Sequence, residues 1–253
     1  MKKIFKKGVQ FYLKILTRII LWRKDPLIIA VAGSTNKTFV KEIILEELGR
    51  KPDLIRGNPK SFNTEIGLPL AVLFLPSGYS SLFKWADILL TGTVISFFSR
   101  TFPKILVLEM GVDKKGDMEY LLSMVRPSIV VVTDVSKSFP STGTSLDDIA
   151  MEIEFLVKKI PKNGLAILNY DDERVRKMED FCRCKVVFYG KNENCDVRVD
   201  KITTTTTGQS FELVMDEKKE RIEIDRFGQH NIHSLMAGKI VARELQKRGI
   251  ENA

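Results

Sequence analysis

The 253-residue chain is poor in cysteine and has no long apolar segment. Its three cysteines, Cys182, Cys184 and Cys195, are too few and too clustered for the disulfide framework of a small secreted protein. A reduced, cytosolic setting is therefore expected. No stretch of about 18 consecutive apolar residues occurs, which argues against an ordinary transmembrane helix. With 44% hydrophobic and 28% charged residues, the chain has the composition of a globular protein that buries a full core.

Acidic residues are almost absent from the first 25 positions. This segment carries eight lysines and arginines against Asp25 alone, whereas the rest of the chain holds 32 basic and 31 acidic residues. The segment thus supplies all but one of the net eight positive charges, and the body of the protein is close to neutral. A nucleic-acid-binding domain would carry a basic face on its folded body, so no nucleic-acid partner is predicted.

Residues 1–25 are predicted to form a separate basic amphipathic helix. Apolar side chains recur at helical spacing between lysines, at Phe5, Val9, Tyr12, Leu13, Leu16 and Ile20. Such a helix suits an anionic membrane surface, which would place residues 1–24 peripherally at the inner face of the cell membrane. Docking on the domain and contact with a partner protein are the alternatives. The apolar run 19–22 is too short for the hydrophobic region of a signal peptide.

Short apolar segments alternate with helical ones from residue 27 onward. Buried strands are predicted at 27–32, 104–109, 128–133 and 164–169. Helices are predicted at 37–49, 145–160 and about 230–247, and Ser145 and Asp148 have capping-box spacing. This alternation predicts an α/β fold with a mainly parallel sheet. A small, more polar β-rich part is expected to follow, with strands at 186–190, 196–207, 210–215 and 220–224. Its threonine run, 203–207, is expected to be an exposed strand.

The segment GSTNKT (33–38), between the first strand and the first helix of the body, is predicted to bind phosphate. A glycine-containing turn at that place points backbone N–H groups and the positive helix end toward an anion. Lys37 would reach the outer phosphates, and the Thr38 hydroxyl would face Mg²⁺. The general phosphate-loop pattern is not met, because Val31 and Asn36 replace its two glycines. Asn36 would take a positive φ, at a cost of roughly 1 kcal/mol. A structural turn with an exposed lysine is the alternative.

Glu109 ends the predicted strand 104–109. Ligands bind beyond the carboxyl ends of the strands in a parallel sheet, so Glu109 and Thr38 are expected to converge on one cation. Two oxygen ligands, completed by phosphate oxygens and water, suit Mg²⁺. A carboxylate that simply faces solvent is the alternative.

Five ordered segments resemble the Mur ligase family, in particular the central ATP-binding domain of its D-alanyl-D-alanine-adding (MurF) type. They are AGSTNKTFVKEII (32–44), FNTEIGLPLAVL (62–73), LVLEMG (106–111) with GDMEYLL (116–122) and RPSIVVVTDV (126–135), GLAILNYDD (164–172), and FGQHNIHSLMAG (227–238). The resemblance covers about residues 26–253 and implies a central domain of that family.

The resemblance implies an ATP-dependent amide-bond ligase of peptidoglycan precursor synthesis that works through an acyl phosphate, with ATP and Mg²⁺ as cofactors. Lys37 and Glu109 match catalytic positions, and Thr38 and Glu109 match metal ligands. The implied ATP site comprises Gly33, Ser34, Thr35, Asn36, Lys37, Thr38, Asn169, Asp171, Asp172, His230 and Asn231. Asn63 and Thr64 match a segment that faces the acceptor substrate, a cell-wall precursor. His233 is expected to carry no function.

Besides Asn36, which replaces the family's glycine before the loop lysine, three positions depart from the family pattern. Phe139 replaces a metal-binding histidine, Ile153 replaces a lysine that serves a second metal, and Ser234 replaces an asparagine. Ile153 lies on the apolar face of its predicted helix and is expected in the core. First-metal ligands remain while second-metal ligands do not, which questions catalysis more than nucleotide binding. The alternative function is a catalytically degraded, membrane-associated ATP-binding or scaffold protein.

The resemblance implies that the family's N-terminal and C-terminal domains are absent from this chain. In the family the C-terminal domain closes over ATP, and closure of this kind excludes water from a reaction. The resemblance therefore implies a ligase that is incomplete as this chain alone. A truncated reading frame, a partner that supplies the missing C-terminal domain, and a nucleotide-binding relic are the alternatives.

Overall fold

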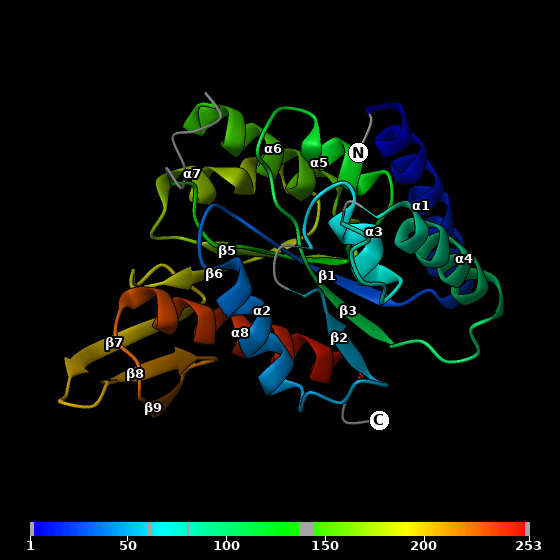
Figure 1. Cartoon of the computed structure of the whole chain (residues 1–253). Coiled ribbons are helices and arrows are strands. Elements are labelled where there is room, and N and C mark those ends of the chain that lie inside the picture. The colour runs from blue at the N-terminus through cyan, green and yellow to red at the C-terminus, as the bar shows by residue number, and fades with distance from the viewer. Residues whose placement is uncertain (1–2, 60–61, 80, 137–143, 251–253) are drawn as a thin grey trace.

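The computed structural model describes residues 3–59, 62–79, 81–136 and 144–250. Within them, nine strands form one sheet in the order β2-β3-β1-β4-β5-β6-β7-β8-β9 (Figure 1). The strands are β1 (Leu27–Ala32), β2 (Ile55–Gly57), β3 (Ile105–Glu109), β4 (Ile129–Val132), β5 (Leu165–Asn169), β6 (Lys185–Gly190), β7 (Val197–Thr204), β8 (Gln209–Met215) and β9 (Lys218–Ile224).

The pairs from β2 to β7 are parallel, whereas β7–β8 and β8–β9 are antiparallel. This confirms the predicted α/β class. The polar strands near the C-terminus continue the main sheet through the parallel β5–β6 and β6–β7 pairs. The expected strand over 203–207 is wrong beyond Thr204, because the chain turns there: the Thr205 hydroxyl accepts hydrogen bonds from the N–H groups of Thr207 and Gly208. A threonine side chain that bonds to the backbone two residues on favours such a turn.

Helices cover both faces of the sheet. They are α1 (Lys3–Lys24), α2 (Lys37–Glu47), α3 (Gly67–Val72), α4 (Leu82–Phe98), α5 (Asp117–Leu122), α6 (Leu146–Lys159), α7 (Glu173–Arg176) and α8 (Gln229–Lys247), with a 3₁₀ turn at Lys177–Phe181. The predicted capping box of α6 is present, since Ser145 and Asp148 each bond the other's backbone N–H.

Side chains of β1 alternate between two apolar cores. Ile28, Ala30 and Ala32 join the core under α1, α3, α4, α5 and α6, whereas Ile29 and Val31 join the core under α2 and α8. A strand that is buried on both faces must be apolar throughout, which is why LIIAVA shows no alternation of polar residues.

Helix α1 packs on the domain beside α3 and α4 (Figure 1). Four of the six apolar residues in its predicted stripe, Val9, Leu13, Leu16 and Ile20, are at most 3% exposed. The structure therefore corresponds to the docked-helix alternative, and this stripe contacts protein. Among the described helices, none combines the length and apolar character needed to cross a membrane.

Candidate functional site

The loop after β1 lies where the strand order reverses, between the ends of β3 and β4. Gly33 has φ 134°, and a Cβ there would lie 2.0 Å from the Thr133 hydroxyl oxygen. The Asp134 side chain accepts hydrogen bonds from the Thr35 N–H (2.9 Å) and hydroxyl (2.8 Å), and its carbonyl accepts one from the Ser34 N–H (2.8 Å). The loop is thus tied to the end of β4. Crevices of this kind are the usual ligand sites of open α/β sheets.

Asn36 has φ 60° and ψ 4°, the left-handed conformation predicted for it. Its side chain does not cap α2, which begins at Lys37. The first N–H groups of this helix consequently have no side-chain acceptor from the N-cap residue, and they mark the positive end of the helix dipole. The arrangement suits the binding of an anion.

The Lys37 ammonium folds back onto the loop, where it donates to the Gly33 carbonyl (2.7 Å) and the Ser34 carbonyl (3.0 Å). Burial lowers the pKa of Lys37, and the neighbouring charges of Glu109 and Asp134 oppose that shift. Lys37 is therefore not the exposed lysine of the alternative prediction, because its ammonium is tied to the loop.

Glu109, at the end of β3, is brought against the start of α2. Its Oε2 accepts a hydrogen bond from the Thr38 hydroxyl (3.0 Å), as the strand order predicts. Its Oε1 lies 2.8 Å from the Lys41 ammonium, in an ion pair whose side chains are 3% and 2% exposed. Lys41 also donates to the Asn58 carbonyl (2.6 Å), and the Asn58 side chain accepts from the Glu109 N–H (2.9 Å). Glu109 is thus held from three sides.

An open cavity of about 610 Å³ lies beside these groups, and Lys37, Thr38, Asn63, Thr64 and Glu109 line it. Its size is that of a small-molecule site. A hard cation prefers oxygen ligands, so the Thr38 hydroxyl and the Glu109 Oε2 are a suitable pair for Mg²⁺.

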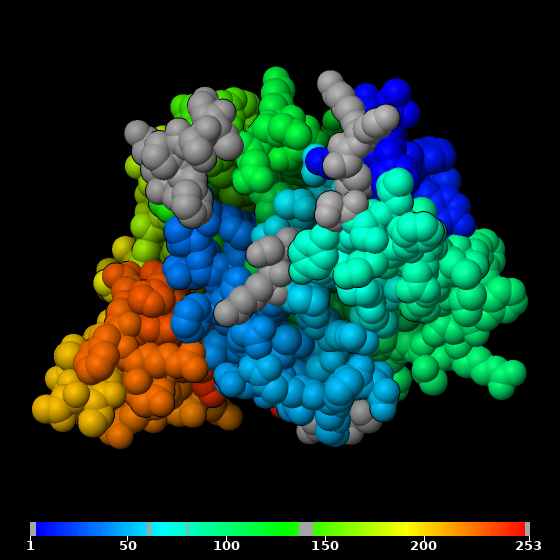
Figure 2. All heavy atoms as spheres, viewed as in Figure 1, coloured from blue at the N-terminus to red at the C-terminus, as the bar shows by residue number. Residues whose placement is uncertain are grey.

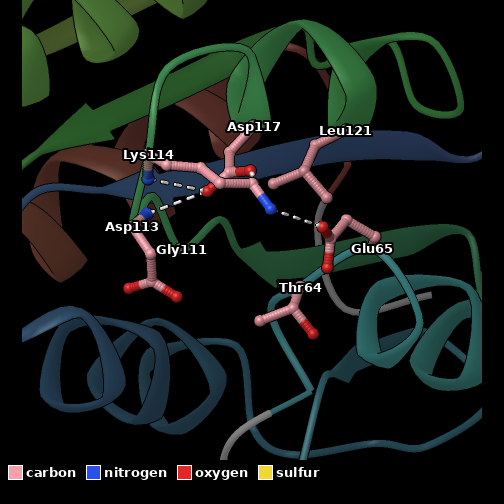
Figure 3. Close-up of a pocket in the computed structure, with 7 residues that line it drawn as sticks. All are labelled: Thr64, Glu65, Gly111, Asp113, Lys114, Asp117 and Leu121. Carbon is pink, nitrogen blue, oxygen red and sulfur yellow. Dashed lines mark hydrogen bonds and ion pairs between the residues drawn. The ribbon is translucent and has the colours of Figure 1, made fainter. Parts of the chain in front are cut away.

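A smaller cavity of about 50 Å³ adjoins the first through Thr64, which lines both (Figure 3). Figure 3 shows the Lys114 ammonium directed toward Glu65, at 3.4 Å, while the Asp117 carboxylate accepts from the N–H groups of Asp113 and Lys114. The charges of Glu65 and Asp117 raise the pKa of Lys114. This polar corner extends the main cavity on the side of Asn63 and Thr64.

A third cavity of about 220 Å³ lies on the other side of the loop, between the ends of β4 and β5 and the start of α8. Thr35, Asn36, Asn169, His230 and His233 are among its lining residues. Asn169 is buried, and its side chain donates to the Thr133 carbonyl (2.7 Å) and accepts from the Asp171 N–H (3.1 Å). The sheet therefore places the predicted phosphate loop between two cavities.

The residues predicted to lie beside the nucleoside do not all line the 220 Å³ cavity. His233, expected to have no function, lines the 220 Å³ cavity and lies 3.0 Å from the Asp171 carboxylate. Burial would raise the pKa of Asp171, but hydrogen bonds from His233 and the Lys191 N–H outweigh it and hold that pKa below its ordinary value.

Asp172 and Asn231, two members of the predicted ATP site, do not line the 220 Å³ cavity. Asp172 accepts from the N–H groups of Val135 (2.8 Å) and Val175 (3.0 Å), so it caps α7 and anchors the end of β4. Asn231 lines a separate cavity of about 360 Å³ between α2 and β9, and its Oδ1 is buried with no hydrogen-bond partner among the described residues.

The departures from the family pattern also have places in the structure. Ile153 is 1% exposed and belongs to the core on the α6 face of the sheet, as expected. Ser234 is buried and donates to the His230 carbonyl (2.8 Å), one helical turn back. Phe139 lies outside the described residues.

Sequence reasoning missed Lys41, Asp134 and Tyr189. Lys41 follows Lys37 by four residues, and this spacing puts both side chains on one face of the helix. The spacing could therefore have predicted that Lys41 also faces the strand ends. Asp134 follows β4 in the same way that Glu109 ends β3. Tyr189 is buried with its hydroxyl bonded to the Val132 carbonyl (3.1 Å), and no local pattern marks it as part of the third cavity.

The fold and the site define an α/β protein with a glycine-containing loop and a helix N-terminus at the switch point of a parallel sheet. Residues 86–242 match the model of the Mur ligase middle domain, and the chain belongs to the Mur ligase family.

Curated relatives are consistent with this family. The UDP-N-acetylmuramoyl-tripeptide–D-alanyl-D-alanine ligase of Buchnera aphidicola is 24% identical over 234 residues, which cover 90% of this chain and 45% of that protein. The ligase of the same name from Bacillus subtilis is 25% identical over 222 residues, covering 88% and 42%. The chain thus spans less than half the length of these relatives.

Solved structures share the fold. MurF from Acinetobacter baumannii superposes with a TM-score of 0.74 at 18% identity, over 96% of this chain and 47% of that one. The MurF ligase from Thermotoga maritima, solved in complex with ADP, gives a TM-score of 0.71 at 21% identity, over 96% and 50%.

Proposed function

We propose that this chain is the ATP-binding part of an ATP-dependent amide-bond ligase of peptidoglycan precursor synthesis. The observation that carries the proposal is the convergence of Lys37, Thr38 and Glu109 at one cavity, which Asn63 and Thr64 also line. Its relatives are named for joining a UDP-N-acetylmuramoyl tripeptide to D-alanyl-D-alanine. The proposed site residues are those that line this cavity or that match the family motifs.

Each proposed role has a physical basis. Lys37 would exchange its two loop carbonyls for oxygens of the outer phosphates, because an ammonium binds a phosphate more strongly than a neutral carbonyl. Thr38 and Glu109 would hold Mg²⁺, which supplies neutralisation of charge on the transferring phosphoryl group when bound. Asn63 and Thr64 would align the acceptor carboxylate, and alignment is a large part of phosphoryl-transfer catalysis.

The nucleoside would occupy the 220 Å³ cavity beside Asn169 and His230. His233 joins the proposed site there, because its bond to Asp171 fixes the ring at the cavity wall. Asp172 and Asn231 would act indirectly, through the end of β4 and the start of α8. Closure over ATP and capture of the amine are proposed to need the part of the family architecture that lies outside the aligned half, either in the same polypeptide or in a partner.

A second function, an ATP-binding scaffold without ligase activity, is favoured by one observation. Ile153, at the position of the family's second-metal lysine, is sealed in the apolar core. Burying an ammonium at this apolar core position would be costly, which favours a packing role for this side chain.

The test is the binding of Mg-ATP to the full chain by calorimetry, compared with Lys37→Ala and with the exposed-lysine control Lys177→Ala. We expect saturable binding that weakens at least tenfold in Lys37→Ala and is unchanged in the control. No binding at millimolar ATP would overturn the proposal.

Phosphate release separates the two functions. The wild-type chain is incubated with Mg-ATP, a UDP-N-acetylmuramoyl tripeptide, D-alanyl-D-alanine and the C-terminal domain of the Bacillus subtilis relative. A ligase releases phosphate only when both co-substrates are present. ATP binding without such release would favour the scaffold.

A further inference from the structure

The outward faces of α1 and α4 form one apolar surface. On α1, Phe11, Ile15 and Trp22 follow one another at helical spacing, and on α4, Leu90, Val94 and Phe98 do the same. These six side chains, which define the α1–α4 surface, are 38% to 82% exposed. Isolated exposed apolar residues are ordinary, but a contiguous set on two adjacent helices marks an interaction site.

Contacts between the helices fix the two stripes side by side. The hydroxyls of Tyr12 and Thr93 are 2.8 Å apart, and Arg23 donates to the Ser96 carbonyl (2.6 Å). Each helix turns its other side to the core, with Leu16 of α1 closely approaching Gly92 of α4. The stripes therefore face solvent on the same side. In Figure 2 the two helices, blue and blue-green, lie next to each other at the edge of the molecule.

The net charge of the protein is concentrated in the two sequence segments that contain these helices. Residues 1–25 carry a net charge of +7, and residues 82–100 add +1 through Lys84, Asp87 and Arg100. Together they equal the +8 of the whole chain, so the other 209 residues are neutral in sum. Neither helix contains a glutamate, and Asp87 is the only acidic residue in α4.

We propose that the α1–α4 surface lies on an anionic lipid bilayer. Exposed aromatic and aliphatic side chains flanked by Lys and Arg suit the boundary between headgroups and acyl chains, where the basic groups meet lipid phosphates. A second copy of this chain is disfavoured as the occupant, because it would bring one strongly basic surface against another. This contact differs from the one predicted from the sequence of residues 1–24. It uses the side of α1 opposite to the buried stripe, and it includes α4.

The position of the two tryptophans makes the proposal measurable. Trp22 is 82% exposed, whereas Trp85 is 2% exposed and donates to the Tyr79 carbonyl (3.0 Å). A change in tryptophan emission on membrane contact therefore reports Trp22. The full chain is titrated with vesicles of phosphatidylglycerol and phosphatidylcholine, and separately with phosphatidylcholine alone. We expect a blue shift and co-sedimentation with the anionic vesicles, and a loss of both as salt is raised.

Variants identify the surface. Trp22→Ser combined with Phe98→Ser is expected to reduce vesicle affinity at least tenfold, and Arg18→Gln about fivefold. Met151→Ser, at a residue that is 51% exposed on α6, is the matched control and should bind as wild type. Melting temperatures and Mg-ATP binding of the variants are measured alongside, since neither should change.

Three outcomes would overturn the proposal. These are equal binding to both vesicle types, unchanged binding of the Trp22→Ser/Phe98→Ser variant, and a chain that is dimeric through this surface by light scattering and does not bind vesicles. The proposal does not depend on ligase activity, because lipid binding is read without nucleotide.

Discussion

Removal of the Lys41 ammonium should destabilise the protein more than loss of any exposed ion pair. Lys41→Met keeps the length of the side chain but leaves the Glu109 carboxylate, 3% exposed, without its partner at 2.8 Å. It also removes the donor to the Asn58 carbonyl. Breaking one side of a buried pair costs about 3–5 kcal/mol, because the remaining charge stays desolvated. For a chain of this size, that loss lowers the melting temperature by about 10 °C.

Calorimetric and urea unfolding of three variants would measure this effect. Lys177→Met is the matched control: its ammonium lies 2.7 Å from Glu173, but both side chains are more than 65% exposed. We expect its melting temperature to equal that of the wild type, since exposed pairs contribute little.

The double variant Lys41→Met/Glu109→Gln removes both charges. It should be more stable than Lys41→Met alone, because no uncompensated ion remains. A Lys41→Met cost below about 1 kcal/mol would refute the reasoning, since it would mean that the carboxylate is solvated or neutral.

The remaining predictions concern the loop after β1, the first helix, and the loss of stability at acidic pH. Gly33→Ala should abolish Mg-ATP binding in calorimetry, because its Cβ would meet the Thr133 hydroxyl oxygen at 2.0 Å; retained affinity would contradict the loop geometry. Gly8→Ala, with no atom within 4 Å of its Cβ inside α1, should instead stabilise the fold by about 0.5–1 kcal/mol in urea unfolding. The lowered pKa of Asp171 contributes stability that is present above the ordinary carboxyl value of about 3.9 and is lost as pH falls through the folded value. Asp171→Asn should therefore lose less stability than wild type as the pH falls below about 3.9. An equal loss of stability in the two proteins would contradict this.

Strand–helix alternation was enough to predict the parallel sheet and the position of its loop. Asn36 could be assigned a positive φ because the turn demands one and few residue types tolerate it. Thr38 and Glu109 could be brought together because the carboxyl ends of neighbouring parallel strands meet at one edge.

Other features depend on contacts that sequence spacing does not encode. Helix α4 has apolar residues on both its buried and its exposed sides, so it shows no clear periodicity, and it was not predicted. The amphipathic pattern of α1 predicted a helix but not whether protein or lipid would cover the apolar stripe. His233 acquires its place only because Asp171, 62 residues earlier, lies against it.

The two borders of the sheet limit how anything can attach to this protein. One border is β2, only three residues long, and the other is β9, whose sequence KKERIEI has five charged residues among its seven. Short edges and charged edges both resist the addition of a further strand. A companion domain or subunit is therefore expected to bind through side chains and not by adding a strand to the sheet, so point substitutions can change the strength of such a contact. The same two edges protect the folded chain from edge-to-edge aggregation.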